Sequence, residues 1–362
     1  MLKILDWYIL KKFITTFVFA ILLLTFITVV IDISEKSDDF LKSDATLRQI
    51  VTEYYFGFIP HIVSQLFPLF VFISVIFFTS KMAGRSEIIA ILASGTSYTR
   101  FLRPYWIGAI FLALVLWLSF RYVTPVANRM RTVFETTYLD DKAVNNTSKS
   151  PTVYFRNDTT HYGQVSYYDS ANKRGNSFVL QHIVDGKLKE NLRAETLQWD
   201  TLKKGWMLQE VIRHRFDSGK ETVEKIASLP IALNFKPSEF IKSEYTKTVM
   251  KTPELDRFIT QEQLRGSEGI NEFLVERYHR DATPASLIIL TMIGVAVGSR
   301  KVRGGSGLHI AIGFITGSLY ILIDRFSTIF STKGNLPPLL AAWTPNIIFL
   351  VVAIILFKRA PK

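Results

Sequence analysis

Residues Phe13 to Ile31 read FITTFVFAILLLTFITVVI, a run of 19 residues without Asp, Glu, Lys or Arg. A helix needs about 20 such residues to cross the hydrocarbon core of a bilayer, which is about 30 Å thick. Five further runs share these properties: Tyr54 to Thr79, Pro104 to Phe120, Ala282 to Ser299, Gly304 to Ile323 and Gly334 to Phe357. A soluble protein with buried core helices would need six uncharged stretches of this length. The runs therefore predict an integral membrane protein with six transmembrane helices.

The distribution of charge predicts how these helices are oriented. With the amino terminus inside, the inner segments are 1–12, 80–103, 300–303 and 358–362. They carry 13 Lys or Arg and only two acids, Asp6 and Glu87, so they account for nearly all of the formal charge of +12. This excess follows the positive-inside rule and indicates a membrane topology rather than a nucleic-acid surface. Both termini are expected in the cytoplasm, and the long insert is expected outside it.

The insert, residues 124–281, changes from helical to strand periodicity. Phe178 to Val184 is rich in β-formers, and Asp185-Gly186, a dipeptide favoured in type I′ turns, lets Lys187 to Arg193 return as a hairpin. Further strands are predicted at Glu195 to Asp200, Trp206 to Arg213 and Thr222 to Ile226. This spacing favours an antiparallel sandwich or jelly roll over a parallel enzyme fold. Because the chain has no cysteine, the domain must rely on its own apolar core.

Three segments are therefore expected: 1–123 with the first three transmembrane helices, 124–281 with the β domain and connecting helices, and 282–362 with the last three helices. Thr252-Pro253-Glu254 provides a capping residue, a proline at the first helical position and an acid in the first turn, which predicts a short helix. A second helix, Ile270 to Arg280, leads into the fourth span.

Motifs for catalysis are missing from the sequence. It has no GxxxxGK[ST] phosphate loop, no HExxH zinc motif and no GxSxG nucleophile elbow. The chain is therefore not expected to hydrolyse ATP, to hold a metal ion or to act as an enzyme.

The segment between the second and third runs carries the clearest functional signal. Residues 84–95, GRSEIIAILASG, predict a short helix that ends in a glycine suited to a left-handed turn. Ile88, Ile91 and Leu92 share one face of this helix at i, i+3, i+4 spacing. Such a helix is either a connector whose apolar face lies on the membrane surface or the part of a permease that fits the groove of a cytosolic partner.

This segment resembles the coupling helix, RSE...ASG, of the LptF/LptG permeases, the membrane subunits of the lipopolysaccharide-exporting ABC transporter. Other segments also resemble the family: Leu5 to Phe13 (LDWYILKKF), Glu276 to Pro284 (ERYHRDATP) and Leu336 to Pro345. The likeness covers both membrane halves and the three-plus-three layout, whereas the insert agrees in size and strand character only. The arginine before Ser86 favours LptG over LptF.

The resemblance implies an inner-membrane permease subunit with a periplasmic β-jelly roll after its third helix. It implies lipopolysaccharide as the substrate, an LptF-like second permease subunit, a dimer of an LptB-like cytosolic ATPase and LptC/LptA-like bridge proteins. The first and fifth helices of the two permeases would frame a lipid cavity. ATP and Mg would bind to the ATPase, so no cofactor is expected in this chain.

The resemblance also carries site residues over to this sequence. In the family the acid of the coupling helix meets a basic residue of the ATPase, which corresponds to Glu87 here. The coupling residues expected are Arg85, Ser86, Glu87, Ile88, Ile91 and Leu92.

Basic residues at the periplasmic rim of the family hold lipid A phosphates, and arginine's planar donor fork suits phosphate. The candidates here are Lys36, Lys42, Arg129, Arg131 and Arg325. The first-helix lysine typical of LptG is Asp32, which puts phosphate binding there in doubt and leaves Lys36 or Lys42 as the substitute. The alternative for each cation is snorkelling at the membrane interface.

Two other functions remain open at the level of sequence. One is an ATP-independent lipid flippase or secondary transporter, which the lack of a charged relay within the spans disfavours. The other is a membrane-anchored periplasmic receptor, for which six spans and an amphipathic inner helix are more than needed.

Overall fold

The computed structural model describes residues 3–139, 152–169, 172–201, 204–217, 220–235, 237, 246–265, 269–300 and 306–359. The chain divides into two compact units. The helical unit comprises Met1–Arg131, Thr248–Thr252 and Asn271–Lys362, and the β unit comprises Thr132–Lys247 and Pro253–Ile270.

Among the described residues, six helices are long and apolar enough to cross a membrane, which confirms the predicted number of spans. The helices are α1 (Ile4–Lys42), α2 (Leu47–Gln49), η1 (Ile50–Tyr55), α3 (Phe56–Gly84), α4 (Glu87–Ala93), α5 (Tyr98–Leu118), η2 (Ser119–Val123), α6 (Thr124–Phe134), η3 (Glu135–Leu139), α8 (Thr246–Val249), α9 (Thr252–Arg265), α10 (Ile270–Gly298), α11 (Ser306–Thr332) and α12 (Pro338–Lys358). The three η segments are π-helices, so the second and third spans combine α and π turns. The first residues of the fifth predicted run, Gly304 and Gly305, lie outside the described residues.

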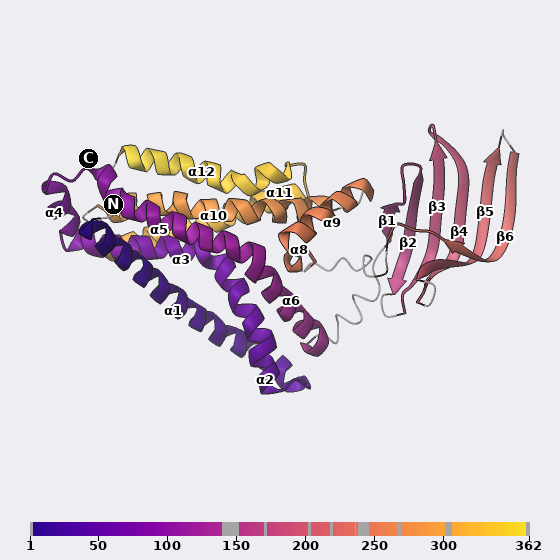
Figure 1. The fold of residues 1–362 in the computed structure, drawn as a ribbon, viewed down its shortest axis with the longest axis horizontal. Coiled ribbons are helices and arrows are strands. Elements are labelled where there is room, and N and C mark those ends of the chain that lie inside the picture. Colours follow the sequence, from indigo (N-terminus) through magenta and orange to yellow (C-terminus); the bar gives the residue numbers. More distant parts are fainter. Residues whose placement is uncertain are drawn as a thin grey trace. The chain divides into compact units, whose positions relative to one another are not determined.

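The connections around the spans agree with the sequence in two places. α9 begins at Thr252, as its capping signal predicts, and the helix predicted at Ile270 to Arg280 continues without a break into the fourth span as α10. Figure 1 shows that the start of α1, the end of α12 and α4 lie at the same end of the helical unit.

Aromatic rings hold the first three spans together at that end. The Phe13 ring of α1 stacks on Phe78 of α3 at 5.6 Å, and Phe78 stacks on Tyr105 of α5 at 5.3 Å. A Cβ atom at Gly108 would lie 2.5 Å from the Phe13 ring, so the glycine is what lets α5 approach α1 so closely. Small residues at helix crossings are the usual means of close packing in membranes, where no hydrophobic effect drives helices together.

The spans differ in how much of their surface this chain covers. In the second and fourth spans, 61% of the most apolar 18-residue stretch is buried. The corresponding share is only 6% in α1 and 22% in α11. The apolar faces of α1 and α11 are therefore left for lipid or for another protein to cover.

The β unit contains one antiparallel sheet whose strands follow one another in chain order, β1-β2-β3-β4-β5-β6. The strands are β1 (Val153–Arg156), β2 (His161–Asp169), β3 (Arg174–Val184), β4 (Lys187–Asp200), β5 (Gly205–Asp217) and β6 (Lys220–Ile231). The predicted all-β, antiparallel insert is thus confirmed. The strands β1 and β2 are not predicted from the sequence, because polar residues and tyrosines blur their alternation.

The β3–β4 hairpin forms where the sequence predicts it. Asp185 and Gly186 have φ angles of 49° and 71°, the two positive values that a type I′ turn requires. Lys187 pairs with Val184 across the turn. Lys187 to Arg193 and Glu195 to Asp200, predicted as separate segments, are one strand of 14 residues.

One face of the sheet carries the apolar core of the β unit. Glu210, which has a φ of 53°, is unpaired opposite Glu195 of β4, and the buried face of β5 shifts by one residue there while the register of the two strands stays the same. Trp206 and Leu208 are therefore buried before Glu210 and Val211 after it. The buried core consists of Phe155, Val165, Tyr168, Phe178, Leu180, Leu192, Ala194, Leu197, Trp206, Leu208, Val211 and Phe235.

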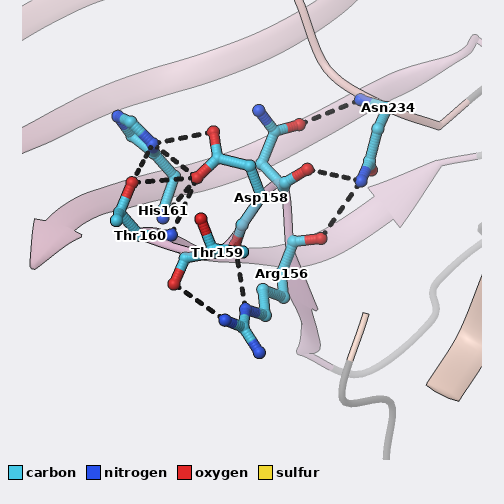
Figure 2. Close-up of polar contacts among 7 residues, drawn as sticks. Arg156, Asp158, Thr159, Thr160, His161 and Asn234 are labelled. Carbon is cyan, nitrogen blue, oxygen red and sulfur yellow. Dashed lines mark hydrogen bonds and ion pairs between the residues drawn. The ribbon is translucent and has the colours of Figure 1, made fainter. Parts of the chain in front are cut away.

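Polar bonds fix the β1–β2 turn, as Figure 2 shows. The Asp158 carboxylate accepts from the backbone N–H groups of Thr160 and His161, both at 2.9 Å, and Asn234 Nδ2 donates to the carbonyl of Asn157 at 2.6 Å. Desolvation opposes ionisation of Asp158, but the hydrogen bonds from Thr160 and His161 outweigh it and hold the pKa of this carboxyl well below its ordinary value. The cluster is a structural turn that ties the chain after β6 to the loop after β1.

Candidate functional site

The predicted coupling helix is present as α4, with left-handed residues at both ends. Its N-cap, Ser86, has a φ of 60°, and Gly95 after its last turn has a φ of 84°. Glycine adopts this conformation freely, as predicted. A serine in the same conformation is uncommon, and such residues concentrate at functional positions.

Glu87, the first residue of α4, is bound by α1. Lys12 Nζ lies 3.0 Å from Glu87 Oε2, and the Tyr8 hydroxyl donates to the same oxygen at 3.1 Å. Lys12 also donates to the Tyr8 hydroxyl and lies over the Tyr8 ring. Arg85 is more distant, with Nη1 4.0 Å from Glu87 Oε1. The Glu87 side chain is still 25% exposed, so another cation has access to it.

A second ion pair joins α1 to the start of α5. Asp6 is 2% exposed, and its Oδ2 accepts from Arg100 Nη2 at 2.6 Å and from the backbone N–H of Lys3 at 2.8 Å. The two acids of the predicted inner segments, Asp6 and Glu87, therefore both bridge α1 to the α4–α5 region.

The apolar face of α4 packs on the helical unit itself. Ile88 is 2% exposed within the core formed by α1, α3 and α5, and Ile91 and Leu92 pack against that core. Ile89, on the other side, is 52% exposed. The shared face is as predicted, but in this structure Ile88, Ile91 and Leu92 point inward, and Ile89 is the isoleucine that α4 exposes. Sequence periodicity shows that a face is apolar, not whether the same chain or a partner covers it.

A cavity of about 530 Å³ opens beside α4. Its walls come from α4 through Ile88, Ile89 and Leu92, from α5 through Tyr98 and from the end of α10 through Arg300. The walls are mainly apolar with one cation, which is the character of a pocket for a protein side chain or an apolar ligand.

The five candidate phosphate-binding cations are only partly brought together. Lys36 Nζ lies 4.7 Å from the centre of the Tyr54 ring, and the Arg131 guanidinium lies 5.3 Å from the centre of the Phe58 ring. Tyr54 and Phe58 stack at 5.7 Å, so Lys36 and Arg131 lie on one aromatic cluster. Both side chains are partly exposed, so a phosphate oxygen can approach their charges.

The other three candidates are solvent-exposed: Lys42 at the end of α1, Arg129 in α6 and Arg325 in α11. Within the described part of the chain, no contact joins them to the aromatic cluster. Asp324, next to Arg325, lies 3.6 Å from His279 of α10, so this acid contacts a neighbouring helix.

Asp32 is buried. It occupies the position where the LptG proteins that the sequence resembles typically have a lysine. Its two oxygens accept from the hydroxyls of Tyr54 and Tyr55 at 3.0 and 3.1 Å. The carboxylate thus closes α1 onto the start of the second span and offers no positive charge.

Several residues of this region are not singled out by the sequence analysis: Tyr8, Lys12, Arg100, Tyr54 and Tyr55. The sequence carries a signal for Tyr8 and Lys12, because their i, i+4 spacing places them on one face of a helix. Acids are scarce in the predicted inner segments, so few residues there could pair with this face. Their pairing with Glu87, across 79 residues for Tyr8 and 75 for Lys12, is visible only in the folded chain. Among the described residues no group of three or more His, Cys, Asp or Glu is arranged to hold a metal ion.

Comparison with known proteins covers both candidate regions. The family model described as "Lipopolysaccharide export system permease LptF/LptG" matches residues 7–359, nearly the whole chain. No curated protein matches the chain. The matched range includes α4, the cations of the aromatic cluster and the complete sheet.

Proposed function

The chain belongs to the LptF/LptG family of lipopolysaccharide export permeases, and from this premise we propose that it works as the LptG-like subunit of an ATP-driven transporter. In this role it extracts lipopolysaccharide from the inner membrane and passes it to a periplasmic bridge. The observation that carries the proposal is α4, a short helix with an accessible acid, placed at the end of the helical unit where both chain termini are proposed to face the cytoplasm.

An LptB-like ATPase dimer is proposed as the cytosolic partner. The chain has no phosphate loop of its own, so the energy must come from another subunit. Glu87 offers a quarter of its side chain to a partner's cation, and Ile89 with the adjacent cavity offers an apolar contact. This combination of one charge and one apolar anchor is typical of a small, specific protein interface.

A second permease subunit is proposed to cover α1 and α11. These two spans are the least buried of the six, and the most apolar stretch of α1 is almost bare. A lipid cavity framed by the first and fifth spans of two subunits would use these surfaces. The exposed side chains of α1 include Phe19, Leu22 and Phe26, which suit the acyl chains of a lipid.

The β unit is proposed to receive the acyl chains on its apolar face and to pass them to a bridge protein that adds to the sheet. Photo-crosslinkers at Trp206, Leu208 and Val211 are expected to label lipopolysaccharide or the bridge, and those at Met207 and Gln209 are not. The two-residue period of labelling should shift by one residue at Glu210, because the buried face of β5 shifts there. Labelling that ignores this pattern contradicts a path along the apolar face.

The rim cations are proposed to attract the phosphates of the lipid. Each exposed contact is expected to contribute about 0.2 to 1 kcal/mol, so single alanine variants should export normally. The triple variant Arg129→Ala, Arg131→Ala, Arg325→Ala should export markedly less, and raising the salt concentration should reproduce its defect in the parent. A lipid-binding assay at two salt concentrations measures both effects.

The control for this prediction removes three exposed lysines from the sheet: Lys187→Ala, Lys189→Ala and Lys220→Ala. It lowers the net charge by the same amount but leaves the rim intact. If the triple arginine variant folds normally and binds lipopolysaccharide like the parent, the rim only anchors the protein at the interface, and the phosphates are bound elsewhere.

The proposed function as a whole is tested by purification in mild detergent followed by mass spectrometry of proteins and lipids. We expect an ATPase, a second permease of the same family and lipopolysaccharide to co-purify. Lipopolysaccharide without any ATPase would instead indicate an ATP-independent lipid transporter.

A further inference from the structure

The first helix is fastened to the rest of the helical unit mainly at its two ends. Its buried residues are Asp6, Ile9, Phe13, Phe17 and Asp32. Between Phe17 and Asp32 no residue of α1 is buried in this chain. The middle of α1 is covered only in part, through Ile21 and Leu24, which pack against the core of the unit. The strongest contacts of α1 are therefore those at its ends.

The contacts at the α4 end are unusually polar for a helix start. Glu87 receives Lys12 and Tyr8 from two successive turns of α1, and Asp6 receives Arg100 from the start of α5. Glu87 is the first residue of α4, and Arg100 follows α4 by seven residues. α1 is thus bound on both sides of the coupling helix.

We propose that Lys12 and Tyr8 are positioning residues that join α1 to α4 through Glu87, so that a displacement of the coupling helix moves the first membrane span. The inference rests on the proposed function, because the displacement is supplied by the ATPase. Ile88 packs against the same core as Phe13, so apolar contacts join α4 to the first turns of α1 as well. The middle of α1 exposes Phe19, Leu22 and Phe26, so a displacement of this helix moves the surface that is proposed to face lipid.

The physical link is tested on the purified full chain in nanodiscs, without any ATPase. The chain has no cysteine, so Leu23→Cys on α1 and Leu114→Cys on α5, both exposed positions, can be spin-labelled directly. Electron-spin distance measurements should give a broader distribution with a second population for Lys12→Ala, and a smaller broadening for Tyr8→Phe. Lys11→Ala, which removes the neighbouring exposed lysine, should match the parent.

Charge exchange makes this test specific. Lys12→Glu places two acids face to face and should broaden the distribution most, whereas the exchange Lys12→Glu with Glu87→Lys restores opposite charges and should recover the parent distribution. Lys12→Arg should keep it. If Lys12→Glu leaves the distribution unchanged, or if the exchange does not recover it, the joint does not hold α1 and the proposal is wrong.

The transmission step is tested in the assembled transporter by the amount of lipopolysaccharide exported per ATP hydrolysed. Lys12→Ala should lower this ratio by up to about fivefold, the upper end for an ion pair of this exposure, while the yield of the complex stays the same. An unchanged ratio overturns the transmission role. Failure of the proposed function is distinguishable, because in that case no ATPase co-purifies with the parent, whereas the distance measurement needs none.

Discussion

Glu87→Arg is expected to lower ATPase binding or lipid-stimulated ATP turnover by about tenfold or more, because losing a desolvated charge pair typically costs about 2 to 5 kcal/mol. The variant disturbs two contacts of residue 87, one with the partner ATPase and one with Lys12 of α1. It repels the partner's basic residue, and it sets a cation next to Lys12, whose Nζ lies 3.0 Å from the carboxylate in the parent. Glu87→Gln, which keeps the shape and removes only the charge, should give a smaller loss.

The control for a new arginine on this surface is Thr99→Arg, at an exposed position in the first turn of α5, outside α4. It should leave the yield of the complex and its turnover near those of the parent. The measurements are co-purification of the ATPase and phosphate release with and without lipopolysaccharide. Normal complex yield together with normal export by Glu87→Arg would exclude a coupling role for this residue.

Trp206→Ala is expected to have the largest effect on stability, a loss of about 3 to 5 kcal/mol in the β unit. The side chain is 3% exposed, stands 5.0 Å from the Trp199 ring and 5.7 Å from Phe235, and donates from Nε1 to the Phe235 carbonyl at 2.8 Å. Truncation leaves a cavity in the apolar core of the β unit and deprives that carbonyl of its donor.

Proteolysis of the full chain in detergent measures this loss. A cost of about 3 kcal/mol raises the population of the opened β unit by about two orders of magnitude, and cleavage should accelerate accordingly if opening is fast. Trp199→Ala provides the control, since the Trp199 side chain is only partly buried and should cost less. Equal cleavage rates for Trp206→Ala and the parent would show that this tryptophan does not hold the sheet together.

The membrane architecture follows from the sequence because the bilayer imposes a requirement on each segment separately. An uncharged run such as Phe13 to Ile31 has to be a helix in lipid, whatever its neighbours do, since no water satisfies its backbone. The β3–β4 hairpin is equally local, because Asp185 and Gly186 accept the positive φ angles that its turn demands. The helix at α4 also follows from its own residues, from the apolar spacing and the terminal glycine.

The partners of these residues are decided by contacts between segments far apart in the chain. Lys12 meets Glu87 across 75 residues and Arg100 meets Asp6 across 94, and neither pairing has a signature in local spacing. Local sequence determined which elements form and which faces are apolar, because those depend on backbone hydrogen bonding and on water. Only the tertiary structure decided that α4 turns its apolar face inward and that its Glu87 pairs with α1. A charge or an apolar face has many possible partners, and the packing of the whole unit selects among them.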